Sequence, residues 1–181
     1  MSEEKTLGEE RREALFSAPK NGWDLIDETV EQAVTAYATD YKAFLDRGKT
    51  ERRVVNCTVE LARAAGFKPF ERGMELKAGD RVYRVNRGRA IMLAVIGSAP
   101  LDQGVTIGAA HIDSPRLDLK PNPLYEDGEL AFFKTHYYGG VRKYQWVTIP
   151  LELHGVVGLK DGTLVDMKVG DRPEDPKFTI D

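Results

Sequence analysis

His111 and Asp113 lie two residues apart at the end of a short apolar segment, a spacing that could support metal chemistry. Residues 104–110 are small or apolar, which predicts a fully buried strand ending at His111. Side chains at i and i+2 of an extended backbone point to the same side, so the imidazole and the carboxylate can meet. One ring nitrogen can then bind a metal ion while the other donates a hydrogen bond to the carboxylate. The alternative is a buried structural histidine that bonds a carboxylate without any metal.

The sequence after this pair continues into a longer motif, His111-Ile-Asp-Ser-Pro-Arg-Leu-Asp-Leu-Lys-Pro. This motif closely resembles the histidine motif of the aspartyl aminopeptidase family of dinuclear zinc exopeptidases. Residues 86–97, which begin Asn-Arg-Gly-Arg, and residues 134–146, which begin Lys-Thr-His-Tyr-Tyr-Gly-Gly, look like segments of bacterial members. The resemblance therefore covers nearly the whole chain.

This resemblance implies an activity and a role for each residue of the pair. His111 would be a zinc ligand, and Asp113 would orient it and support catalysis. The complete enzyme would hold two zinc ions and hydrolyse N-terminal residues from peptides with a metal-activated water. Cobalt or manganese could replace zinc, because nitrogen and carboxylate ligands suit all three metals.

The chain departs from the family in its length. Two zinc ions need more than one histidine, because each takes several nitrogen and carboxylate ligands and keeps a position for water. Family members supply a bridging aspartate, further acidic ligands, a second histidine and a glutamate general base later in the chain. This sequence ends at Asp181, before those residues would appear. We therefore expect the N-terminal portion of a peptidase, inactive alone, that arose as a truncation, a split gene or a fragment.

A second hypothesis of a different class stays open at this point. The chain could be a non-catalytic module that acts only in assembly or protein interaction, with the histidine motif as a relic. Supplying the missing ligands would restore peptidase activity under the first hypothesis and would not under the second.

The composition disfavours several other functions. The formal net charge is −3, and the basic residues are interspersed with acidic ones, so no surface for nucleic acid is expected. The first residues are charged without the apolar stretch of a signal peptide, and no uncharged apolar run is long enough to span a membrane. The single cysteine, Cys57, suits a reducing cytoplasm and is interpreted as a small buried hydrophobe. We expect a cytoplasmic protein without nucleic-acid or membrane partners.

The first half of the chain has a helical pattern. Residues 27–46 carry apolar side chains at intervals of three and four, which predicts an amphipathic helix that Asp24 or Asp27 caps and Gly48 ends. A second helix is predicted over residues 50–66, with a threonine as its cap and a glycine at its end. Residues 1–20 are charged and weakly patterned, which predicts a flexible N-terminal arm.

After residue 79 the apolar period changes from about four to two. Residues 82–85 and 90–96 flank Asn-Arg-Gly-Arg, which predicts a hairpin, and residues 98–103 form a loop that leads into the strand before His111. A site at the end of a buried strand is typical of a layered α/β protein. We therefore expect an α/β fold in which residues 21–120 form the N-terminal part of a three-layer zinc-exopeptidase catalytic domain.

Beyond residue 120 short strands follow one another without helices between them. Strands are predicted over residues 130–135, 147–158 and 163–167, with turn signals between them. This pattern indicates a β-rich module. The resemblance implies that residues 121–181 are the start of an inserted β-rich subdomain through which family members form homo-oligomers.

The two remaining histidines have structural and functional interpretations. The run that contains His136 favours a turn over a substrate-binding loop. His154 alternates with apolar residues on a predicted strand, which is typical of a structural histidine. In family assemblies a histidine of a neighbouring subunit can reach an active site, so this role for His154 stays an alternative.

Overall fold

The computed structural model describes residues 5–180, and its helices and short sheets confirm a mixed α/β fold. Contacts divide the chain into two compact units, Met1–Ala43 and Phe44–Asp181. The predicted domain boundaries after residues 20 and 120 do not coincide with this division and stay predictions. Each unit is described by itself below.

A short helix, α1 (Leu7–Leu15), lies within the predicted N-terminal arm. Thr6 and Glu9 form a capping box: the Glu9 carboxylate accepts a hydrogen bond from the Thr6 amide at 2.8 Å, and the Glu9 amide donates to the Thr6 hydroxyl. No residue of α1 is buried. The helix therefore depends on local capping, a signal that its weak apolar periodicity did not reveal. Residues 1–4 of the predicted arm lie outside the described part of the chain.

The capping box makes the stability of α1 depend on pH. The hydrogen bond from the Thr6 amide lowers the pKa of Glu9 below its ordinary value of 4.5. A lowered pKa means that the cap stabilises α1 above pH 4.5, and that this stabilisation is lost as the pH falls through the folded-state pKa. We expect the helical Cα chemical shifts of residues 7–15 to decrease over that range. Glu9→Gln keeps a capping side chain that does not titrate, so it should reduce the pH dependence; identical profiles would contradict this account.

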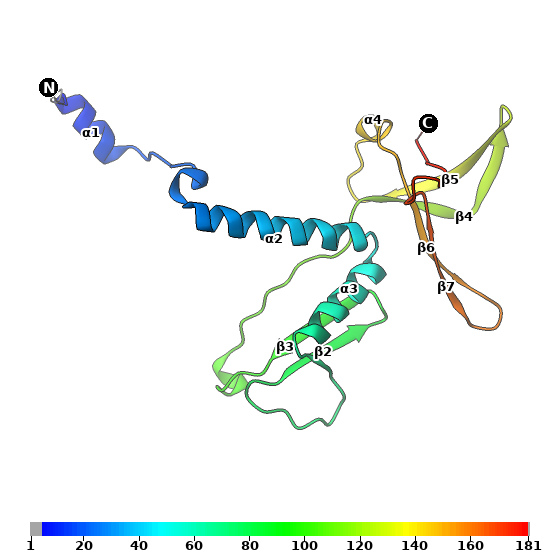
Figure 1. Ribbon diagram of the computed structural model, residues 1–181, viewed down its shortest axis with the longest axis horizontal. Coiled ribbons are helices and arrows are strands. Elements are labelled where there is room, and N and C mark those ends of the chain that lie inside the picture. The colour runs from blue at the N-terminus through cyan, green and yellow to red at the C-terminus, as the bar shows by residue number, and fades with distance from the viewer. Residues whose placement is uncertain (1–4, 181) are drawn as a thin grey trace. The chain divides into compact units, whose positions relative to one another are not determined.

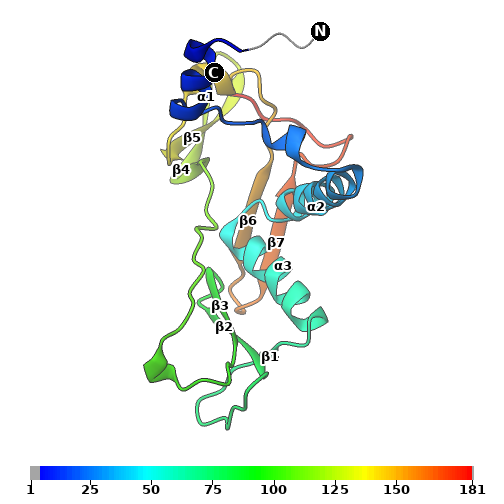
Figure 2. The same cartoon turned by 90° about the vertical axis from the view of Figure 1, so that its left-hand side faces the viewer.

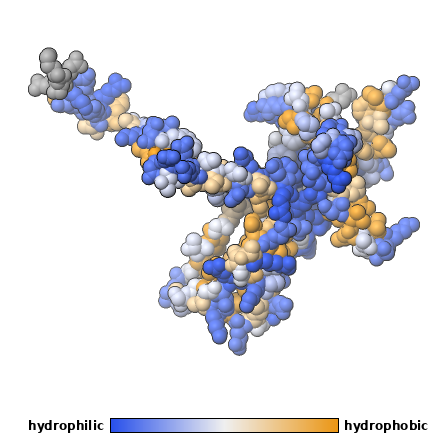
Figure 3. Space-filling view, in the orientation of Figure 1, coloured by the Kyte–Doolittle hydropathy of each residue, from blue (hydrophilic) through white to orange (hydrophobic). Residues whose placement is uncertain are grey.

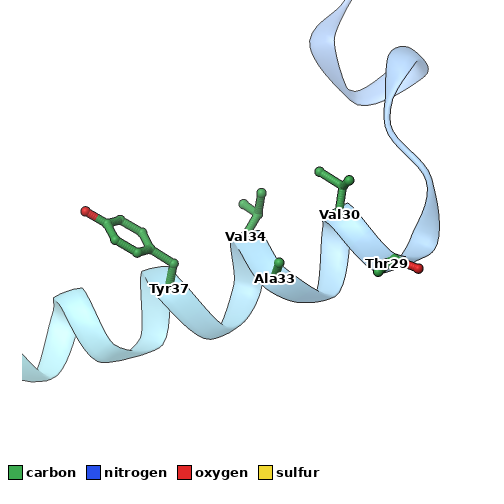
Figure 4. Close-up of a pocket in the computed structure, with 5 residues that line it drawn as sticks. All are labelled: Thr29, Val30, Ala33, Val34 and Tyr37. Carbon is green, nitrogen blue, oxygen red and sulfur yellow. The ribbon is translucent and has the colours of Figure 1, made fainter.

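The long helix α2 (Glu28–Arg47) confirms the predicted amphipathic helix to within one residue at each end. Its first turn is capped by Asp27, whose carboxylate accepts a hydrogen bond from the Val30 amide at 2.9 Å. Val30, Val34 and Tyr37 project from one side of this helix (Figure 4) and are largely exposed. The apolar face predicted from the sequence therefore exists, but no described residue of the first unit covers it.

In the second unit, helix α3 (Glu51–Ala64) carries most of the buried core. Thr50 caps it, because its hydroxyl accepts a hydrogen bond from the Arg53 amide at 3.4 Å. The buried side chains of this unit belong to α3 and to the strand β2 (Arg81–Asn86); they are Val54, Val55, Cys57, Ala62, Val82 and Tyr83. The burial of Cys57 confirms its interpretation as a small core residue.

Helix α3 packs on a small sheet (Figure 1). Strand β2 pairs antiparallel with β3 (Ala90–Val95), which confirms the predicted hairpin, and β1 (Lys68–Pro69) runs parallel to β2. Arg87 and Gly88 take positive φ angles of 52° and 67° at the turn, as the Asn-Arg-Gly-Arg sequence predicts. A 3-10 turn, η2 (Leu101–Gln103), follows in the predicted loop.

The buried strand predicted over residues 104–110 is absent, so this prediction is wrong for the chain as described. The segment is extended, but it belongs to none of the sheets, and all of its residues are exposed. It leads alone toward the next hairpin (Figure 2). A buried strand needs neighbours on both edges and both faces, and within residues 5–180 no segment pairs with this one. The apolar sequence is suited to burial, but its burying partners are not among the described residues.

The next hairpin begins five residues after His111. Strand β4 (Arg116–Asp127) pairs antiparallel with β5 (Leu130–Tyr138), with a register shift between Leu119 and Leu124. Two prolines lie inside this irregular stretch, where a missing amide donor breaks no ladder bond. No strand was predicted over β4, whereas β5 was predicted over its first six residues.

The last strands, β6 (Leu153–Gly158) and β7 (Leu164–Val169), form a third antiparallel hairpin, as predicted for a β-rich module. A one-turn helix, α4 (Lys143–Trp146), precedes them, and residues 147–152 contribute only an isolated bridge at Leu151 rather than the predicted strand. Apolar residues lie on the visible surface of the β4–β5 and β6–β7 hairpins (Figure 3). Among the described helices, none is both long and apolar enough to cross a membrane.

Candidate functional site

The structure brings His111 and Asp113 together as their spacing predicts. His111 Nδ1 lies 2.9 Å from the backbone oxygen of Asp113 and 3.1 Å from its Oδ1. Both partners are acceptors, so the hydrogen-bond network assigns the proton of the neutral ring to Nδ1 and leaves the lone pair on Nε2. The His111 side chain is 83% exposed, which does not fit a buried structural histidine. The pair therefore presents an imidazole with a fixed inner nitrogen and a free outer one.

Asp113 is held from its other side by Tyr138. The tyrosine hydroxyl donates a hydrogen bond to Asp113 Oδ2 at 2.5 Å. This bond is the main cause that lowers the pKa of Asp113, while His111 contributes less, and the same bond raises the pKa of Tyr138. At neutral pH the carboxylate is therefore ionised and the phenol protonated, which are the forms that this hydrogen bond requires.

Tyr138 is in turn fixed by the hairpin that follows the site. It is the last residue of β5 and pairs in register with Arg116, the first residue of β4. The Arg116 guanidinium lies 4.1 Å from the centre of the Tyr138 ring. It forms ion pairs with Asp118 at 2.8 Å and with Glu51, the first residue of α3, at 3.1 Å. The strand ladder thus places the tyrosine beside a segment 25 residues earlier in the chain.

Tyr138 is the site residue that sequence analysis missed. The sequence indicated a turn for the run that contains it, and β4 was not predicted at all. Without β4 there is no register that pairs Arg116 with Tyr138, so no sequence signal connected the tyrosine to Asp113. A tyrosine next to two glycines, 25 residues downstream of Asp113, becomes informative only once the hairpin is known.

The other two histidines contact residues outside this cluster. The ring of His136 stacks on Tyr137 at 5.4 Å. His154 lies on β6 and is 9% exposed; its Nε2 bonds Glu152 at 2.8 Å, whereas its buried Nδ1 has no partner among the described residues. This position on a strand agrees with the structural interpretation of His154.

The fit of zinc to these residues can be tested from the donor set. A catalytic zinc ion takes three protein ligands and a water. His111 supplies one suitable nitrogen, because Nε2 is free and exposed, and Asp113 is placed to orient the ring. Within residues 5–180, however, no three histidine, cysteine or acidic side chains gather closely enough to hold a metal ion. The described residues therefore fit one ligand of a metal centre and not a whole one.

An imidazole oriented by a carboxylate is the arrangement that metal-ligating histidines usually have, and comparison with known proteins shows the class to which this chain belongs. Residues 44–181 match the family model described as aminopeptidase I zinc metalloprotease (M18). The chain belongs to this M18 family. The family resemblance inferred from the sequence motifs is thereby confirmed.

Similar proteins agree with this membership. The chain is 48% identical over 170 residues to a probable M18 family aminopeptidase 1 of Clostridium acetobutylicum, covering 92% of this chain and 37% of that protein. It is 46% identical over 150 residues to a protein of the same description from Thermotoga maritima, covering 83% of this chain and 33% of that protein. The chain thus spans about a third of the length of these curated relatives.

Solved structures support the fold. The crystal structure of aminopeptidase I from Borrelia burgdorferi matches with a TM-score of 0.84 at 39% identity, over 89% of this chain and 40% of that one. An M18 aminopeptidase structure from Thermotoga maritima matches with a TM-score of 0.80 at 44% identity, over 91% of this chain and 36% of that one. The predicted fold class, an α/β fold that is part of a zinc-exopeptidase fold, is confirmed.

Proposed function

We propose that this chain is the N-terminal part of a zinc aminopeptidase in which His111 is one metal ligand and Asp113 orients it. The observation that carries the proposal is the pairing of His111 Nδ1 with Asp113, which leaves Nε2 exposed. Membership of a family described as zinc metalloproteases supports zinc as the metal. We further propose two zinc ions in the complete site, with cobalt or manganese as possible replacements.

Zinc, when bound, would polarise the scissile carbonyl of a peptide and make a bound water a nucleophile at neutral pH. The residues of this chain would hold the metal ion and orient the ligand that binds it. His111 would bind through Nε2, because Nδ1 is committed to Asp113. Asp113 would fix the tautomer and raise the basicity of the imidazole. The remaining ligands and the general base would come from the two-thirds of the family's length that this chain does not span.

We also propose that residues 121–181 contribute to homo-oligomers. Both hairpins of this region carry large exposed apolar side chains, among them Leu124, Leu130, Val157 and Leu164. Exposed apolar surface on this scale is typical of protein interfaces. The same observation supports the alternative function, a non-catalytic module that acts only through assembly. The buried, free Cys57 supports a reducing compartment such as the cytoplasm.

The test uses a completed protein, defined here as this chain followed by the part of the Clostridium acetobutylicum relative that the chain does not match. We expect the completed protein to release N-terminal residues from peptides, to lose this activity with a chelator and to regain it with zinc. The 181-residue chain alone should release none, because it holds one ligand of the site.

The opposite result would favour the assembly module. If the completed protein folds, as judged by circular dichroism, yet stays inactive with zinc, cobalt and manganese, the peptidase proposal is wrong. Self-association of the chain alone in sedimentation velocity would then leave assembly as the function that the exposed hairpins support.

A further inference from the structure

The extended segment that carries His111 has few connections to ordered structure. Residues 104–115 join no sheet, and all of them except Ile112 and Asp113 are exposed. A histidine on such a segment would sample many orientations, which costs entropy when it binds a metal. If the His111 ring is to act as a ligand with defined geometry, a side chain from outside the segment must fix its orientation.

Tyr138 provides such a connection. Its hydroxyl donates to Asp113 Oδ2, whereas Oδ1 of the same carboxylate faces His111 Nδ1. The two carboxylate oxygens therefore bridge the phenol and the imidazole. Since the Asp113 side chain is 35% exposed, it would otherwise rotate toward water, so the hydroxyl is what holds the carboxylate in the orientation that the ring needs.

The hairpin makes Tyr138 rigid enough for this task. The ladder between β4 and β5 fixes its backbone, and the Arg116 guanidinium covers its ring. The next residue, Gly139, has φ +75°, and a Cβ there would lie 3.4 Å from Pro115 Cα, so the end of β5 lies closely against the segment after Asp113. The Tyr138 hydroxyl therefore reaches the Asp113 carboxylate from the end of β5.

We propose that Tyr138 is a positioning residue for the metal ligand: it fixes the Asp113 carboxylate, which holds the His111 ring in the tautomer with a free Nε2. This inference rests on the proposed function, because it concerns the same site. It adds a third residue, supplied by the hairpin, to a pair that the motif contains. The ion pairs of Arg116 with Asp118 and Glu51 hold in place the guanidinium that covers the Tyr138 ring.

The decisive measurement is the tautomer ratio of His111 in the 181-residue chain, without metal. Long-range ¹H–¹⁵N correlation spectra at a fixed pH of about 8.5, where an ordinary imidazole is neutral, report this ratio directly. The wild-type ring should be mainly the Nδ1–H form. Tyr138→Phe removes only the hydroxyl and keeps the ring under Arg116, and it should shift the ratio toward Nε2–H by roughly three- to tenfold, the effect of about one hydrogen bond.

Two further variants make the test specific. Tyr137→Phe is the matched control, because this neighbouring tyrosine stacks on His136, whereas Tyr138 is the tyrosine that donates to Asp113; its His111 ratio should equal the wild-type ratio. Asp113→Ala removes the carboxylate and should shift the ratio at least as far as Tyr138→Phe. If Asp113→Ala has no effect, the backbone oxygen alone sets the tautomer and the inference is wrong.

A second readout separates this inference from the proposed function. In the completed protein, Tyr138→Phe should weaken zinc binding by roughly 10–100-fold in a chelator competition, as is usual when a partner of a metal ligand is lost. An unchanged tautomer ratio in a folded Tyr138→Phe chain overturns the role of Tyr138, whatever His111 does. A changed ratio, together with zinc binding that does not respond to His111→Ala, overturns the proposed function instead.

Discussion

His111→Ala is expected to lower kcat/KM of the completed, zinc-loaded protein by more than about 100-fold. Loss of a residue that only orients a ligand typically costs about 10–100-fold, and loss of the ligand itself should cost more, because the metal loses a bond as well as its geometry. The exposed Nε2 and the anchored Nδ1 place this effect at His111. Release of an N-terminal residue from a chromogenic peptide, at saturating zinc, measures it.

His136→Ala is the matched control for this experiment. His136 is also exposed and near the end of β5, but its ring stacks on Tyr137 and its backbone pairs in register with Asp118. We expect its kcat/KM to stay within about threefold of the wild-type value, because this change removes no interaction made in the transition state. Equal losses in both variants would mean that the decrease reflects damage to the hairpin, and a His111→Ala protein with normal activity would remove His111 from the metal site.

Local sequence signals were sufficient for the elements that are stabilised locally. Helix α2 and the hairpin β2–β3 follow from apolar period, an aspartate cap and a turn sequence, all of which act within a few residues. The pairing of His111 with Asp113 also follows locally, because an extended backbone places i and i+2 on one side. These predictions needed no knowledge of the rest of the chain.

The features that were missed depend on distant residues. The expected strand over residues 104–110 has the right composition, but a strand exists only with paired neighbours, and none pairs with it in residues 5–180. Conversely, β4 forms despite two prolines, because β5 supplies the ladder and the irregular register accommodates them. Tyr138 enters the site only through that register, so its role could not be read from spacing.

The same contrast between local pattern and burial yields the largest expected effect on stability. Val55 is 1% exposed and is the most deeply buried hydrophobic side chain of the described residues. It lies on α3, which packs against β2 and β3. Val55→Asp would place a carboxylate there without a partner, which costs about 3–5 kcal/mol, much of the total stability of a typical domain. We expect the chain to lose most of its cooperative urea transition, followed by far-UV circular dichroism.

Val34→Asp separates burial from helix propensity. It makes the same chemical change inside α2, at a side chain that is 42% exposed. Because valine and aspartate have similar helix propensities, the free energy of unfolding should change by less than about 1 kcal/mol. A Val34→Asp chain as unstable as Val55→Asp would show that aspartate in a helix, not its burial, causes the loss. A Val55→Asp chain with a normal transition would mean that α3 does not form the core on which β2 and β3 pack.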